Sequence, residues 1–152
     1  AAHLQRENRQ RQRQPDPEAA RHVDQFGIWS RIRGRLQRFE RLLAGADERS
    51  QAAAIILAGG IAYLFSLDRE WTTEWLVPRF SWHDKPLSAA QAWHGFLAFG
   101  HHWDQALLPH LLPSFAQGFG RLDYDLKPVR EEFCRFLAHV VSFADQDPIA
   151  AS

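Results

Sequence analysis

The sequence of 152 residues contains no methionine and a single cysteine, Cys134. One cysteine cannot form a disulfide within the chain and is typical of a protein kept in a reducing compartment. We therefore expect a cytoplasmic location and a buried, structural Cys134 thiol beside Phe133. Because methionine is missing even at position 1, we expect this sequence to be a piece of a larger protein rather than a processed chain.

Long apolar runs and net charge are also missing. A membrane-spanning helix needs ~20 apolar residues, and the longest apolar run, residues 52–65, is interrupted by Gly59 and Gly60. The first residues are polar and basic, so we expect no signal peptide here. The formal net charge is zero, so the chain as a whole does not attract nucleic acid. We expect no membrane span and, for the chain as a whole, no nucleic-acid partner. A basic arm at residues 1–14 that binds nucleic acid or anionic lipid is the alternative to a solvated linker there.

The common catalytic motifs are absent as well. The sequence has no GxSxG, no GxxxxGK[ST], no GxGxxG and no HExxH pattern, which are the signatures of hydrolases, phosphate-binding loops, dinucleotide folds and zinc proteases. We expect no cofactor and no intrinsic enzymatic activity.

Helical periodicity fills most of the chain. Apolar residues recur every three or four positions over residues 28–43, 47–66, 69–77, 88–100, 104–118 and 128–144, the period of amphipathic helices. This predicts one all-α domain over residues 16–145, with residues 1–15 a polar basic linker or helix end and residues 146–152 a tail. About six antiparallel helices stacked as pairs, in an α-solenoid of the HEAT type, is the arrangement we expect. A compact helical bundle is the alternative.

Several residues predict where helices begin and how they pack. Asp47, Asp68 and Ser88 each precede a helical segment and are expected to cap it. Gly59 and Gly60 lie within the segment 47–66, where we expect them to let a neighbouring helix approach closely.

Residues 71–103 predict the packing centre, because they contain five of the six Trp in the chain. A buried Trp removes on the order of 150–250 Å² from water. The residues expected at this centre are Trp75, Pro78, Phe80, Trp82, Trp93 and Phe96.

The same segment contains four of the eight His. The residues His94, His101 and His102, with Asp104, are the candidate metal ligands, and a metal site needs three or four ligands that converge. Their spacing favours ordinary hydrogen-bonded or surface imidazoles. A small metal-dependent enzyme that uses this His/Asp cluster at 94–110 is the alternative function.

Positive charge gathers in the first third of the chain. Residues 1–49 have a net charge of +4 and residues 50–152 a net charge of −4. On the helix 28–43, Arg31, Arg35 and Arg38 recur every three or four residues. This pattern occurs on solvated helix faces and on docking surfaces for acidic partners. We expect it to contribute an interaction surface, for a protein partner or for self-association within a larger assembly.

A helix that ends at a proline, an aromatic loop and a Trp-x-Gly-aromatic-Leu helix follow one another at Leu76, Pro78, Phe80, Trp82, Trp93, Gly95, Phe96 and Leu97. This pattern resembles the helical C-terminal region of large bacterial sirtuin-type anti-phage defence proteins, over roughly residues 50–143. In that family an N-terminal sirtuin-like domain hydrolyses NAD, and the helical part supports oligomerisation or senses a phage component. The resemblance implies a non-catalytic scaffold or sensor region, and no catalytic or NAD-binding residue carries over, because this sequence has no Rossmann-type unit.

Overall fold

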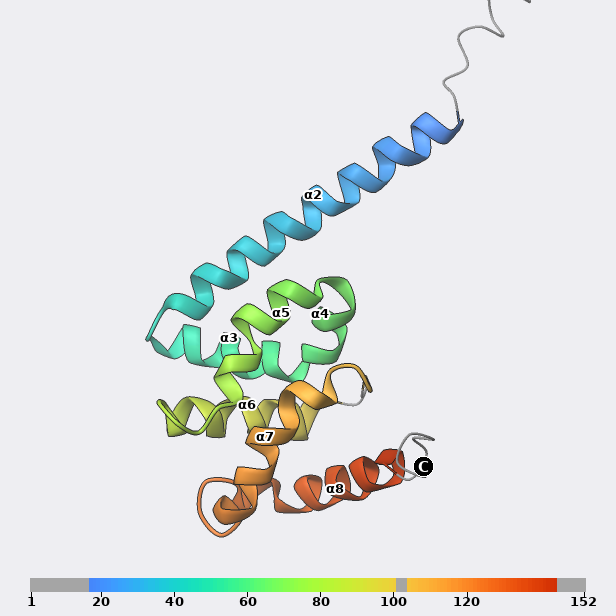
Figure 1. Cartoon of the computed structure of the whole chain (residues 1–152). Coiled ribbons are helices and arrows are strands. Elements are labelled where there is room, and N and C mark those ends of the chain that lie inside the picture. Colours follow the sequence, from blue (N-terminus) through green and yellow to red (C-terminus); the bar gives the residue numbers. More distant parts are fainter. Residues whose placement is uncertain (1–16, 101–103, 145–152) are drawn as a thin grey trace, which may run out of the picture. The chain divides into compact units, whose positions relative to one another are not determined.

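A computed structural model describes residues 17–100 and 104–144 (Figure 1). All regular secondary structure in these two stretches is helical, which confirms the all-α fold. The predicted linker 1–15 and tail 146–152 lie outside the described residues. The elements are α2 (Pro17–Ala44), α3 (Glu48–Gly59), α4 (Ile61–Leu67), α5 (Arg69–Trp75), η1 (Val77–Phe80), α6 (Pro86–Phe99), α7 (Leu108–Gly118), η2 (Phe119–Arg121), η3 (Lys127–Val129) and α8 (Arg130–Ala144).

The chain divides into two units, Ala1–Arg38 and Phe39–Ser152. The single domain expected over residues 16–145 stays a prediction. The described part of the first unit is a stretch of α2. The second unit contains the end of α2 and every other described element, so it is the unit with a core.

Two predicted helix starts are confirmed by their capping hydrogen bonds. The Asp47 carboxylate accepts a hydrogen bond from the backbone N–H of Ser50 at 2.9 Å, and the Asp68 carboxylate accepts one from the N–H of Trp71 at 2.9 Å. Side-chain and backbone hydrogen bonds from Ser50 lower the pKa of the Asp47 carboxyl group, because they favour its ionised form. The cap predicted at Ser88 is wrong, since α6 begins at Pro86, where a first-turn proline needs no N–H partner.

The segment 47–66 is not one helix. It breaks at Gly60, and α3 and α4 are bent by 74° with respect to each other. Glycine has a low helix propensity, so a bend costs least at the Gly59–Gly60 pair. Within the described residues no single helix is long and apolar enough to cross a membrane. Only α3 and α4 taken together, across this bend, reach the required length and hydropathy.

Close packing of α3 against α6 is the most extensive pairing of elements in the second unit. A Cβ atom added to Gly95 would lie 2.1 Å from the carbonyl oxygen of Ile55, and one added to Gly59 would lie 3.0 Å from the carbonyl oxygen of Gly95. The backbones therefore touch where both helices have glycine. This confirms that Gly59 lets a neighbouring helix approach closely.

The direction of these two helices differs from the prediction. The Gln91 side chain donates a hydrogen bond to the Gln51 side chain at 3.4 Å, and a Cβ on Gly59 would lie 3.1 Å from the Cβ of Phe99. Contacts thus advance in the same direction along both helices, which run parallel. Antiparallel pairing was expected for consecutive helices with short turns, but α4, α5 and η1 intervene between α3 and α6 (Figure 1). The stacking as helix pairs, or as a bundle, stays a prediction.

The core is a cluster of aromatic rings. Trp93 on α6 has no exposed surface, donates a hydrogen bond from its indole N–H to the carbonyl oxygen of Phe80 at 3.1 Å, and meets the Phe80 ring edge-on at 5.0 Å between centroids. Phe115 on α7 stacks on Phe133 of α8 at 4.3 Å and lies 5.8 Å from Trp93. One indole therefore connects η1, α6 and α7, and Phe115 extends the cluster to α8.

The predicted packing centre is confirmed for four residues and wrong for two. The buried residues are Phe80, Trp82, Trp93 and Phe96, whereas Trp75 is only half-buried and Pro78 is exposed. The prediction for Cys134 is also wrong, because its side chain is exposed. Phe133 and Phe136 point into the core from the other face of α8.

Replacement of Trp93 tests the aromatic core. We expect Trp93→Ala to lower the free energy of unfolding by roughly 3–5 kcal/mol, through lost transfer energy and the cavity that remains. Chemical denaturation measures this change. Trp29→Ala is the matched control, because Trp29 is 56% exposed. Equal stability of the two variants would contradict the assignment of Trp93 to the core.

Replacement of Gly95 tests the contact between α3 and α6. A Gly95→Ala methyl group would overlap the Ile55 carbonyl oxygen, so the helices must separate and we expect a loss of about 1–3 kcal/mol. Gly120→Ala is the control, since nothing lies within 4 Å of a Cβ at that position. Denaturant midpoints of the two variants give the comparison, and an unchanged midpoint for Gly95→Ala would show that the helices are not in backbone contact.

Candidate functional site

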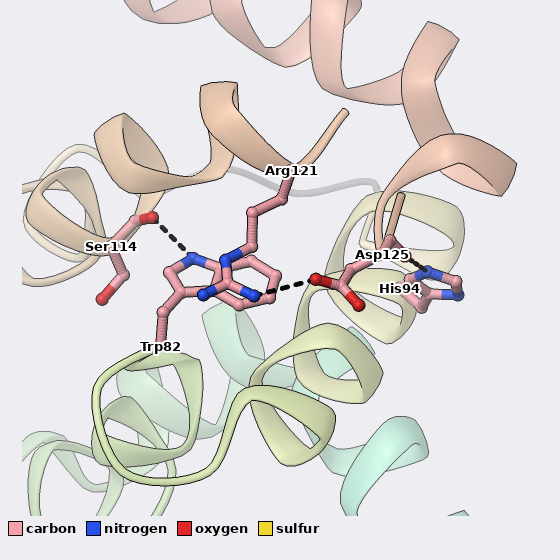
Figure 2. A network of polar contacts seen from close by, with 5 residues as sticks. All are labelled: Trp82, His94, Ser114, Arg121 and Asp125. Carbon is pink, nitrogen blue, oxygen red and sulfur yellow. Dashed lines mark hydrogen bonds and ion pairs between the residues drawn. The ribbon is translucent and has the colours of Figure 1, made fainter. Parts of the chain in front are cut away.

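His94, the first of the candidate metal ligands, belongs to a polar network (Figure 2). It lies on α6, and its Nε2 atom is 2.8 Å from the backbone carbonyl oxygen of Asp125. A carbonyl oxygen only accepts hydrogen bonds, so Nε2 carries the proton in this contact. The Asp125 carboxylate forms an ion pair with the Arg121 guanidinium at 2.9 Å. The imidazole therefore bonds the backbone of Asp125 rather than its carboxylate.

The same network continues to Trp82. The Arg121 guanidinium lies over the Trp82 ring, 4.6 Å from its centroid, and the Trp82 indole N–H donates to the carbonyl oxygen of Ser114 at 2.9 Å. Figure 2 shows these side chains gathered between α6, α7 and the turn before η3. The network connects elements far apart in sequence. An exposed cation–π contact contributes about 0.5–1 kcal/mol, and an exposed ion pair between residues four apart contributes about 0.5 kcal/mol at most. Its geometry is that of a structural connection.

The other candidate ligands are engaged elsewhere or lie outside the described residues. The Asp104 carboxylate accepts a hydrogen bond from the backbone N–H of Ala106 at 2.8 Å, and the His110 ring packs 5.7 Å from that of Phe65. His101 and His102 lie outside the described residues. Over residues 17–100 and 104–144, no group of three His, Cys, Asp or Glu side chains could hold a metal ion.

The candidate interaction residues all lie on the surface of α2. Arg31, Arg35 and Arg38 are exposed. Their spacing places them on one side of the helix. Ile28 is 54% exposed and Trp29 is 56% exposed, although both belong to the apolar stripe that the periodicity of residues 28–43 predicts. Burial on that stripe begins only at Leu36, which is 5% exposed.

Sequence reasoning missed a hollow on the second unit. A cavity of about 700 Å³ opens where the turn between α2 and α3 meets the end of α5, η1 and the start of α6. Trp75 and Pro78, expected in the core, line it together with Arg79 and Lys85. Arg79 donates a hydrogen bond to the carbonyl oxygen of Leu43, thirty-six residues earlier in the chain. No local pattern relates two such distant positions, and the only local signal is an arginine beside a proline and near a tryptophan.

Comparison of the chain with family models, with curated proteins and with solved structures yields no match.

Removal of metal tests the alternative of a metal-dependent enzyme. We expect the chelator EDTA to leave the melting temperature of the purified chain unchanged, because His94 and Asp104 are each engaged in protein hydrogen bonds. Thermal melting with and without EDTA, followed by zinc addition, measures this. A melting temperature that falls with EDTA and returns with zinc would contradict the expectation, and a His94→Ala variant would show whether that histidine is involved.

Proposed function

We propose that this chain is a non-catalytic helical region that acts by protein–protein contact or oligomerisation. On this proposal it is a scaffold or sensor region of a larger bacterial anti-phage defence protein. The observation that carries the interaction role is the exposure of Ile28 and Trp29 on α2.

Ile28 and Trp29 offer neighbouring apolar surface that a partner could cover. Full burial of a large apolar side chain stabilises a protein by about 1.5–3 kcal/mol. Ile28 and Trp29 continue the apolar stripe whose later members, Leu36 and Leu43, are buried. A partner helix that lay along this stripe would cover both, as in recognition of an amphipathic helix by an apolar groove.

The charges beside that stripe indicate the kind of partner. Arg31, Arg35 and Arg38 are exposed near the apolar residues, and the chain from residue 50 onward has a net charge of −4. Complementary charge increases the rate of association and fixes the register of an interface. An acidic partner, or the acidic part of a second copy, would therefore fit this side of α2.

The placement in a larger defence protein rests on the resemblance described above. The residues that carry the resembling pattern include Phe80 and Trp93, which pack against each other, and Gly95, where α6 meets α3. The reading frame around this segment provides the test. An upstream sirtuin-like domain would support the placement, and an unrelated neighbour would contradict it.

Charge reversal tests the interaction surface. We expect Arg31→Glu, Arg35→Glu and Arg38→Glu in combination to reduce the assembled fraction, most strongly at low salt, because exposed charges are screened over ~8–10 Å at physiological ionic strength. Sedimentation velocity at low and moderate salt measures assembly, either of the chain alone or with its parent protein.

Two single substitutions provide the matched comparison. Arg135 is an exposed arginine of α8 and does not belong to the α2 surface. We expect Arg135→Glu, which makes the same charge change, to weaken assembly less than Arg35→Glu does. Trp29→Ala should also reduce assembly, with no loss of melting temperature. Assembly that is unchanged in all these variants would remove the interaction role from α2.

A further inference from the structure

The hollow beside α6 gathers cations and hydrogen-bond donors next to an apolar wall. It has a volume of about 700 Å³, and Arg79 and Lys85 line it. Asp84 is the one carboxylate among its described lining residues, so the cations exceed the anions. Leu43, Ala54 and Pro78 supply part of the apolar surface.

Arg79 has spare hydrogen-bonding capacity in this hollow. Its guanidinium is partly buried, and this burial lowers its pKa. It donates to the carbonyl oxygen of Leu43, and within the described part of the chain no carboxylate forms an ion pair with it. A guanidinium has five N–H donors in a planar fork that matches the oxygens of a phosphate or carboxylate. A partly buried cation without a counter-charge is stabilised by an anion.

Trp75 also has a hydrogen-bond donor that no protein group of the described residues uses. The indole N–H groups of Trp71, Trp82 and Trp93 each donate to a protein oxygen. Among the described residues the Trp75 indole N–H has no such partner, and the half-buried ring lines the hollow. A flat ligand ring could stack on this indole, and such aromatic pairs contribute about 0.5–1.5 kcal/mol beyond area burial.

The start of α6 adds a smaller positive potential to the hollow. Pro86 has no N–H, and Lys85, at the position before the helix, makes no side-chain capping hydrogen bond. The helix therefore presents its positive end at the residues Pro86, Leu87 and Ser88, which line the hollow.

We propose that this hollow binds a small phosphate monoester that carries an aromatic or heteroaromatic ring. The ester has close to two negative charges at neutral pH, which match Arg79 and Lys85, and its ring packs against Trp75. This site is separate from the interaction surface of α2 and does not depend on it. It would give the helical region a soluble ligand to sense.

Phenyl phosphate is the probe, because it joins a phosphate monoester to one ring. We expect it to bind saturably in isothermal titration calorimetry, more tightly than inorganic phosphate, with phenol showing no saturable binding. Lys85→Glu should weaken phenyl phosphate binding by about tenfold or more, which corresponds to about 1.4 kcal/mol. Asp84→Asn should tighten it. Trp75→Leu should weaken the binding of phenyl phosphate while leaving that of inorganic phosphate unchanged.

Lys127→Glu is the matched control, because Lys127 is exposed on η3 and lies outside the hollow. It makes the same charge change, so an equal effect of Lys85→Glu and Lys127→Glu would overturn the proposal. The absence of saturable phenyl phosphate binding to the wild-type chain would also overturn it. Vesicles that contain phosphatidic acid separate a lipid source from a soluble one, and binding to these vesicles alone would overturn the proposal. Melting temperatures of all variants exclude unfolding as the cause of lost binding.

Discussion

Backbone contact between α3 and α6 is the constraint on which the second unit depends. At Gly95 no side chain separates the two helices, and a Cβ atom built on this residue would meet the carbonyl oxygen of Ile55 first. This close approach fixes α6, which carries Trp93 into the aromatic core and His94 toward the turn at Asp125. Both the packing of α7 and α8 and the shape of the hollow follow from where α6 lies.

Features of the fold that depend on neighbouring residues could be predicted from the sequence. The caps at Asp47 and Asp68 require only a carboxylate and a backbone N–H three residues later. The burial of Phe80 and Trp93 follows from an apolar pattern with many large rings. The bend at Gly60 was missed because a glycine pair is compatible both with a helix that continues and with one that breaks. The parallel course of α3 and α6 was missed because it is a contact between segments 40 residues apart, as at Gln51 and Gln91.

The candidate site shows the same division. The charge of the α2 surface is visible in the sequence, but the exposure of Ile28 and Trp29 is not. An apolar stripe has the same sequence pattern whether it is buried or exposed. The hollow could not be predicted, since its wall combines the end of α2 with α3, η1 and the start of α6. Trp75 illustrates the point. Its residue type predicts the core, whereas the structure leaves it half-buried in the lining of the hollow.

Because α3 and α6 run parallel, the two helices that touch at the glycines also line the hollow together. Ser50, Gln51 and Ala54 line the cavity from α3, and Pro86, Ser88 and Gln91 line it from α6. Farther along the same two helices, Gly59 and Gly95 hold the backbones together. The same two helices therefore supply both the glycine contact and two walls of the hollow, so the distance between their backbones bears on both. A methyl group added at Gly95 would push α6 from α3 and would also change the spacing of these two walls.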